Sequence, residues 1–295
     1  MASMTSLYLC NRTVYAAVGS PARGGAALSV VCQAELPEGC LINGIITNEA
    51  ALTAALKEFF SANALPAKRV ALVLGGSQFQ HKVLTLPDLP DKKLRSIVTK
   101  ELGMGAGSQT LDDWMLLRRD MKAHSQTVLA TRVERSVIEG LLSAAKGAGL
   151  TLCCIDTGLS CLIKLVRAIP ALAGRTFILL AFDGENLAAL LFVQGQYSYS
   201  TRSRLFNTRG TPEAAAEIAQ KLSGILQFHL TNKSDHRITD VYFAKCEAGE
   251  LESCRPGAEA LGLTVSMLPD APGLRLPSDC CAADAVFAAG SFFGR

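Results

Sequence analysis

The sequence predicts a duplicated α/β fold, because one order of three strands occurs twice in the chain. Residues 175–204 contain two unbroken apolar runs, Phe177–Phe182 and Leu187–Val193, and then an alternating run over 197–201. Two buried strands and one amphipathic strand joined by short turns are typical of a β-meander. A weaker copy of this meander occurs near the N-terminus. Its strands are expected over residues 7–9, 13–18 and 26–31.

Length and composition favour two lobes. The chain has 295 residues, of which 49% are hydrophobic, so it can supply two cores. The formal net charge is only +3 and no block of like charges occurs, so we expect no nucleic-acid binding. The N-terminus lacks a secretory signal pattern, and no apolar run is long enough for a membrane span. We therefore expect a cytoplasmic protein with no direct membrane span.

The ten cysteines and four histidines do not predict a metal site. Cys153–Cys154 and Cys280–Cys281 are adjacent pairs, whereas zinc and redox sites use the C-x-x-C spacing. The histidines are scattered along the chain. Without an export signal, the cysteines are expected to be reduced thiols.

Helical and strand patterns alternate between the two meanders. Asn48 is a good N-cap for a helix whose apolar residues recur at helical spacing from Leu52 to Phe60. The hydrophobic pattern then changes. It predicts five elements in the order strand, strand, helix, strand, strand. This order predicts an inserted subdomain at about residues 69–131. Its elements are expected over residues 69–74, 79–86, 90–102, 111–117 and 127–131.

The remaining patterns complete two lobes, a first over residues 1–173 and a second over residues 174–295. Thr211 and Pro212 are typical of a helix start. Strands that alternate with helices imply a mixed sheet covered by helices. The expected elements are a helix over 137–145, a strand over 150–155, a helix over 159–169, a strand over 238–244, a helix over 247–261 interrupted near Pro256, a strand over 263–267 and a helix over 281–293.

Four short segments carry a resemblance to a known family. They are GIITNEAALTAAL (44–56), VLTLPDLPDKKLRSIVTKEL (83–102), LDDWMLL (111–117) and VLATRVERSVIEGLLSAAKGAGLTLCCIDTG (128–158). In this order they resemble a helix opening, an insertion helix, an acidic-aromatic strand and the approach to the second lobe in the PilM family of type IV pilus assembly proteins. PilM proteins belong to the actin-like ATPase superfamily. The cell-division protein FtsA and the type II secretion protein GspL have the same inserted arrangement and are alternatives within one fold.

The resemblance implies two actin-like (ribonuclease H-like) mixed-sheet lobes with an inserted strand-helix-strand-strand subdomain. It also implies a membrane-anchored partner of the PilN type, whose cytoplasmic N-terminal segment docks beside that subdomain. Residues 79–117 and the first lobe would form the groove. The expected function is a non-catalytic scaffold of a type IV pilus or related secretion platform, peripheral at the inner face of the cell membrane through its partner. Self-association is left open.

The nucleotide signatures that the resemblance implies are altered in this chain. The first phosphate hairpin would fall near Leu9–Asn11, where no acid occurs, and Ala181 stands where the family has Asp in the second. Lys245–Glu247 replaces the adenine-side Gly-Gly. The chain also passes directly from Arg204 to Thr211, so the second lobe is expected to lack the family's extra subdomain. We therefore expect no catalytic residue, no bound cofactor and no metal.

The alternative prediction is an active actin-like ATPase or phosphotransferase that binds Mg-ATP between the lobes. Its candidate cofactor-binding residues would be Asn11, Asp183 and Gly184, with the carboxylate orienting Mg²⁺ or water. However, Asp-Gly in a tight hairpin is typical of ordinary turn chemistry. The sequence therefore favours the non-catalytic interpretation.

Overall fold

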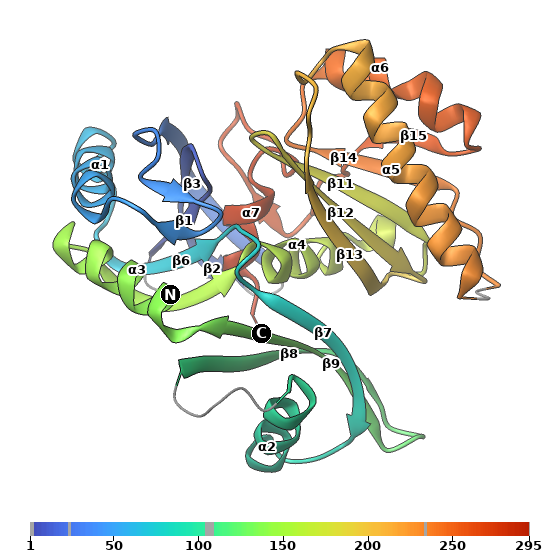
Figure 1. Cartoon of the computed structure of the whole chain (residues 1–295), viewed down its shortest axis with the longest axis horizontal. Coiled ribbons are helices and arrows are strands. Elements are labelled where there is room, and N and C mark those ends of the chain that lie inside the picture. Colours follow the sequence, from blue (N-terminus) through green and yellow to red (C-terminus); the bar gives the residue numbers. More distant parts are fainter. Residues whose placement is uncertain (1–2, 23–24, 104–108, 233–234, 295) are drawn as a thin grey trace.

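The computed structural model describes residues 3–22, 25–103, 109–232 and 235–294. The chain forms two α/β lobes and a smaller subdomain (Figure 1). In Figure 1, the first lobe with α1 and α3 lies on the left, the second lobe with α5 and α6 on the right, and the inserted subdomain with α2 below them.

The first lobe is built on a six-stranded mixed sheet in the order β10-β6-β1-β2-β3-β16. β1 pairs antiparallel with β2 and parallel with β6. The helices α1 (Glu49–Ala62) and α3 (Arg135–Gly147) pack their apolar residues against one face of this sheet. The strands are β1 (Met4–Leu9), β2 (Thr13–Ala22), β3 (Gly25–Glu35), β6 (Lys68–Leu74), β10 (Thr151–Thr157) and β16 (Leu274–Arg275).

The second lobe has a five-stranded sheet in the order β13-β12-β11-β14-β15. One face of the sheet is covered by α5 (Pro212–Thr231) and α6 (Ala248–Ala260). Only residues 205–211 connect β13 to α5, and they contain no helix or strand. The strands are β11 (Phe177–Asp183), β12 (Asn186–Val193), β13 (Gln196–Arg204), β14 (Asp240–Ala244) and β15 (Thr264–Met267).

Two helices fill the space between the lobes. α4 (Gly158–Arg167) buries eight of its residues, and α7 (Val286–Ala289) packs against it within one core that joins both sheets. The end of the chain thus returns to the first lobe, where β16 pairs with β3. The predicted division at residues 173 and 174 therefore assigns too much to the second lobe. The predicted final helix over 281–293 is also too long, because only α7 and the 3₁₀ turn η3 (Gly290–Phe292) form.

The inserted subdomain is a three-stranded antiparallel sheet in the order β7-β9-β8, with α2 (Asp91–Glu101) on one face. Leu94 and Val98 of α2 pack on Leu84 and Val128. The strands are β7 (Gln80–Pro87), β8 (Thr110–Asp120) and β9 (Ser125–Glu134). The prediction that the insertion starts at residue 69 is wrong, because β6 pairs with β1 and β10 in the main sheet. The insertion begins after Leu74 and ends where α3 starts.

Smaller elements complete the chain. β4 (Leu41–Ile42) and β5 (Ile45–Ile46) form a short hairpin, and η2 (Pro170–Leu172) is a 3₁₀ turn. α6 continues through Pro256 instead of breaking there as predicted. Within the described ranges, no helix is both long enough and apolar enough to cross a membrane.

Candidate functional site

The ends of β1 and β11 meet between the lobes. Tyr8 of β1 donates a hydrogen bond to Oδ2 of Asp183 at the end of β11, at 2.7 Å. Both side chains are almost completely buried, with exposed fractions of 1% and 2%. The Tyr8 ring also stacks on Phe287 of α7 at 4.5 Å between ring centroids. This contact joins three segments that are far apart in the sequence.

The Asp183 carboxylate is already engaged. Arg202 of β13 forms an ion pair with Oδ2, the same oxygen that accepts the Tyr8 bond. Oδ1 is buried and has no hydrogen-bond partner in the described part of the chain. Burial raises the pKa of Tyr8 well above its usual value, and the Asp183 charge raises that pKa further. Tyr8 therefore stays protonated and remains a donor to the carboxylate.

Close packing around this contact requires a glycine. A Cβ on Gly75, just beyond β6, would lie 2.3 Å from the Tyr8 hydroxyl and 3.3 Å from Asp183 Oδ2. Any side chain at this position would displace the Tyr8 hydroxyl from Asp183. The three strand ends are therefore packed as one unit.

Lys245 forms a second contact between the lobes. It follows β14 with a left-handed φ of 55°, and its Nζ lies 3.3 Å from the centroid of the Tyr15 ring on β2. Such a cation–π contact joins the second lobe to the first. Burial lowers the pKa of Lys245 to about 8, while Cys10, Asp183 and Asp284 oppose this shift. We call Tyr8, Asp183, Arg202 and Lys245 the interlobe cluster.

Arg209 binds main-chain carbonyl groups at the β11–β12 turn and after β14. Its guanidinium holds both carboxylate oxygens of Glu250 at 2.7 Å and donates to the carbonyl oxygens of Gly184 and Lys245. Its Cζ lies 4.4 Å from the Phe182 ring centroid. These bonds hold the β11–β12 hairpin against β14 and α6.

Each residue nominated for nucleotide binding lies in or beside a hairpin turn and has its own contacts within the protein. Asn11 accepts a hydrogen bond from the Asn43 amide at 2.7 Å and is thereby tied to the β4–β5 turn. Asp183 contacts Tyr8 and Arg202, and Gly184 is a turn residue with a φ of 61°. In the described ranges, no group of three or more His, Cys, Asp or Glu could hold a metal ion. Of the Asp183 carboxylate, Oδ2 is therefore engaged by Tyr8 and Arg202, whereas Oδ1 has no hydrogen-bond partner within the described ranges.

Sequence reasoning missed most of the interlobe cluster. For Lys245 the only sequence signal is that Lys245–Glu247 stands where the family has Gly-Gly. Tyr8 and Arg202 gave no signal, because their common partner Asp183 is recognisable only in the folded chain.

A second candidate site is a pocket of about 190 Å³ between the inserted subdomain and the first lobe, here called the insertion pocket. Ser160 of α4 donates to the sulfur of Met115 on β8 at 3.3 Å, so the two walls touch. Apolar residues dominate the lining. They are Phe79, Leu111, Trp114, Met115, Leu129, Val133, Ile138 and Ile155.

Two of the acidic residues that line the insertion pocket, Asp112 and Asp156, are paired with cations. Arg132 binds both oxygens of Asp112, at 2.7 and 2.8 Å, and its hydrogen bonds lower the pKa of that carboxyl. Lys164 pairs with Asp156 on the opposite wall. These two ion pairs neutralise part of the lining charge, and most of the lining surface is apolar. Such a surface suits the side chains of a docked segment.

Comparisons with known proteins agree on the fold. No protein-family model matches the chain, and no curated protein matches it significantly. A solved structure described as the PilM-PilN type IV pilus biogenesis complex is similar with a TM-score of 0.76 and 16% identity, over 98% of this chain and 97% of that chain.

Two further structures are similar at lower scores. One is a Bacteroides thetaiotaomicron protein of unknown function with an actin-like ATPase fold, with a TM-score of 0.56, 11% identity and 90% of each chain covered. The other is the ethanolamine utilization protein EutJ from Carboxydothermus hydrogenoformans, with a TM-score of 0.52, 12% identity, and 100% of this chain and 90% of that chain covered. The chain therefore has an actin-like ATPase fold, as the resemblance implied.

Proposed function

We propose that this chain is a non-catalytic scaffold of a type IV pilus or related secretion platform. In this proposal it binds a short cytoplasmic N-terminal segment of a membrane-anchored PilN-like partner in the insertion pocket, and the partner holds it at the inner face of the membrane. The observation that carries the proposal is the apolar insertion pocket, shared by the inserted subdomain and the first lobe. Likeness over 98% of the chain to a structure of a PilM-PilN complex supports the choice of partner.

The size of the pocket favours a peptide over a small molecule. Small-molecule sites usually enclose about 300–1,000 Å³. The insertion pocket holds about 190 Å³, which suits a few apolar side chains of a segment that otherwise lies on the surface. Paired charges at the rim would then contact the polar groups of the same segment.

Removing the inserted subdomain tests the proposal. The excision must spare β6, which lies in the main sheet, so residues 78–132 are the correct choice. Gln80 pairs with Arg132, so the cut ends are adjacent and a short Gly-Ser linker can join them. The excised protein should unfold cooperatively but no longer capture the N-terminal segment of the PilN-like protein from the same genome. Undiminished capture would reject the pocket as the docking site.

The alternative, an active ATPase or phosphotransferase, is favoured only by Asp183, whose Oδ1 is buried without a partner in the described chain. We propose that Tyr8, Arg202 and Lys245 occupy the place of the phosphates and the metal. Calorimetry with Mg-ATP should then give no binding at micromolar concentration. Micromolar binding that Asp183→Ala abolishes would establish the alternative instead.

A further inference from the structure

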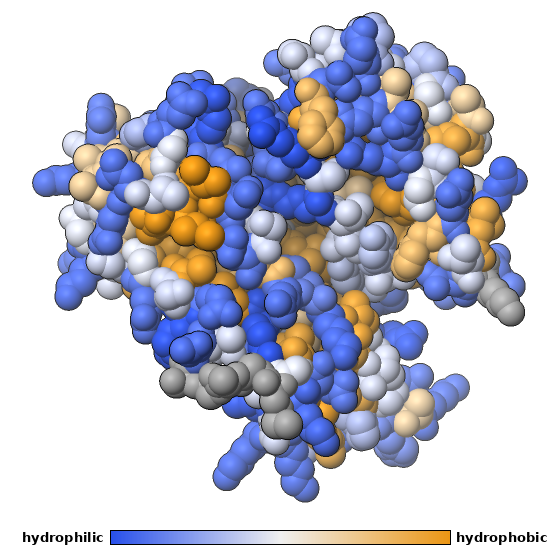
Figure 2. Space-filling model, in the orientation of Figure 1, coloured by the Kyte–Doolittle hydropathy of each residue, from blue (hydrophilic) through white to orange (hydrophobic). Residues whose placement is uncertain are grey.

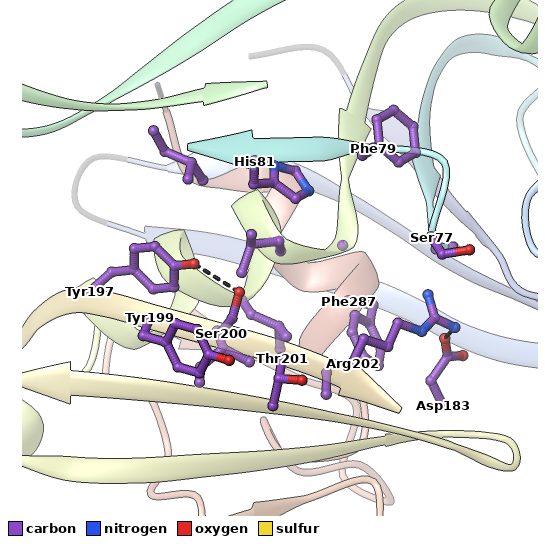
Figure 3. A pocket seen from close by; sticks show the side chains of 18 of the residues that line it. Ser77, Phe79, His81, Asp183, Tyr197, Tyr199, Ser200, Thr201, Arg202 and Phe287 are labelled. Atoms are coloured by element: carbon purple, nitrogen blue, oxygen red, sulfur yellow. Dashed lines mark hydrogen bonds and ion pairs between the residues drawn. The ribbon is translucent and has the colours of Figure 1, made fainter. Parts of the chain in front are cut away.

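A pocket of about 570 Å³ lies between β7 of the inserted subdomain and β13 of the second lobe. Figure 2 shows the hollow where these parts of the molecule meet, with hydrophobic residues in it. In Figure 3, Phe79 and His81 lie on the β7 side of this pocket, while Tyr199 and Thr201 lie on the β13 side. We call it the β7–β13 pocket.

The β7–β13 pocket and the insertion pocket lie on the same face of the inserted sheet. The strand register pairs Leu129 of β9 with Val83 of β7 on one side and with Met115 of β8 on the other. Directly opposite residues of an antiparallel pair share a face, so these side chains form one row across the sheet. Val83 lines the β7–β13 pocket, Met115 lines the insertion pocket, and Leu129 lines both. The row therefore leads from one cavity into the other.

The two cavities adjoin and have their opposite wall in common. Phe79 also lines both cavities. Across from the inserted sheet, Leu159 of α4 lines the β7–β13 pocket and Ser160 of the same helix lines the insertion pocket. Neighbouring strands are about 4.8 Å apart, so the outer strands β7 and β8 are about 10 Å apart. About three residues of an extended chain, at roughly 3.3 Å each, cover that distance.

The lining of the β7–β13 pocket offers no unpaired charge among the described residues. Asp183 and Arg202 form an ion pair with each other. Lys82 lies on the face of the inserted sheet that α2 covers, where its Nζ donates to the carbonyl oxygen of Glu101 at 2.8 Å and to the carboxylate of Glu101 at 3.3 Å. Burial lowers the pKa of His81 to about 4, so its imidazole is neutral at pH 7. An occupant of this pocket therefore meets mainly apolar side chains and hydroxyl groups.

We propose that the partner segment held in the insertion pocket continues across the inserted sheet into the β7–β13 pocket, with an uncharged stretch that carries one apolar side chain for each cavity. The two apolar side chains would stand about 10 Å apart, the distance between the outer strands. This inference rests on the proposed function, because it extends the site of the same partner. The shared sheet face, the two shared side chains and the neutral lining select this occupant.

The extension has a consequence for the whole chain. The insertion pocket is lined by the inserted subdomain and the first lobe, whereas the β7–β13 pocket also includes β12 and β13 of the second lobe. A segment that occupies both cavities contacts all three parts of the molecule. Partner binding then stabilises the position of the inserted subdomain relative to the second lobe.

Val83→Glu tests the extension. Val83 is 39% exposed and lines the β7–β13 pocket but not the insertion pocket. Leu116→Glu is the matched control, because Leu116 belongs to the same sheet, is also 39% exposed and lines neither pocket. Each change puts one carboxylate at a position that water already reaches, so both variants should fold.

Calorimetry should be done with the N-terminal cytoplasmic segment of the PilN-like protein from the same genome. Val83→Glu should bind this segment at least tenfold more weakly than the wild type, a loss of about 1.4 kcal/mol. The reason is that the segment would bury the new carboxylate against an apolar side chain. Leu116→Glu should bind as tightly as the wild type.

Hydrogen exchange provides a measurement that needs no variant. Addition of the segment should slow amide exchange over residues 197–202 of β13, which line the β7–β13 pocket. β15 is the other edge strand of the same sheet and lines neither pocket, so its exchange should stay the same.

Equal affinities of Val83→Glu and Leu116→Glu, or unchanged exchange over residues 197–202, would overturn the extension. Leu111 lines only the insertion pocket, so weaker binding by Leu111→Glu in the same experiment would leave the proposed function standing without the extension. Full binding by both Leu111→Glu and Val83→Glu, or no binding by the wild type, would reject the two proposals together.

Discussion

The contact between Tyr8 and Asp183 shows how single residues define the space between the lobes. The two residues are 175 positions apart, and the tyrosine fills space beside a carboxylate that an actin-like ATPase could use for a metal. Arg202 and Lys245 add two cations close to the same place. At this scale, the Tyr8–Asp183 and Lys245–Tyr15 contacts join the two lobes.

Tyr8→Phe should destabilise the protein. The substitution removes one of two donors to a carboxylate that is 2% exposed, and leaving such a group unsatisfied costs about 1–3 kcal/mol. Urea unfolding measures the loss. Tyr199→Phe is the control, because the described residues provide no hydrogen bond to its hydroxyl, and it should change the free energy of unfolding much less. Equal stability of wild type and Tyr8→Phe would contradict the role of this bond.

Lys245 should give the protein a characteristic pH dependence. Burial lowers its pKa to about 8, while the usual value for lysine is 10.5. Between these pH values the unfolded chain keeps a proton that the folded chain has released, so this group makes stability rise with pH. The raised pKa values of Tyr8 and Cys10 act in the opposite direction and are shared by the variant below.

Comparison with Lys245→Met isolates this contribution. The free energy of unfolding of the wild type minus that of Lys245→Met should increase from pH 8 to pH 10.5 and stay flat below pH 8. Chemical unfolding at several pH values measures it. Parallel curves for the two proteins would show that Lys245 is not buried as described.

Among the elements, those with a strong local signal were predictable. Asn48 caps α1 through its side chain, and Thr211 caps α5 in the same way, as the sequence indicated. The final helix was overextended because residues 281–285 are turns, in which Asp284 binds the Cys281 amide. A short apolar run is buried by tertiary packing whether it is helical or part of a turn, so the run alone does not predict a helix.

Pro256 was expected to break a helix, yet α6 passes through it. The neighbouring Arg255 forms ion pairs with Glu252 and Glu259, and a capping box at Glu247 and Glu250 holds the helix start. These contacts, with the buried Leu251 and Ala258, outweigh the lost amide donor.

Pro256→Ala should stabilise the protein. Alanine restores a helical amide donor and removes the ring from the preceding turn, which together are worth about 1–3 kcal/mol. Greater flexibility of the unfolded chain offsets part of this gain. Thermal unfolding should show a higher Tm for Pro256→Ala than for the wild type. A lower Tm would mean that the proline ring packs favourably where it lies.

For the whole molecule, the order of lobes was predictable but their boundaries were not. β6 has the same apolar pattern as a strand of the insertion, and only its pairing with β1 and β10 assigns it to the first lobe. The return of the chain end, where β16 pairs through two residues with β3, is too short to leave a pattern. Long-range pairing of this kind is fixed by tertiary packing, not by local sequence.

The insertion pocket was also predictable in part from the sequence and in part only from the fold. The resemblance placed a groove at residues 79–117 and the first lobe, and the insertion pocket includes Phe79 and residues 111–115 of that segment. The contributions of β9, α3 and α4 emerge only from the fold.

The most direct test of the proposed scaffold function is the affinity of three proteins for the N-terminal cytoplasmic segment of the PilN-like partner. Leu111→Glu places a charge in the insertion pocket, while Met121→Glu alters a side chain of the same subdomain that is 71% exposed and outside it. Calorimetry should give equal affinities for the wild type and Met121→Glu, and at least tenfold weaker binding for Leu111→Glu, about 1.4 kcal/mol or more. Equal binding by Leu111→Glu would contradict the account.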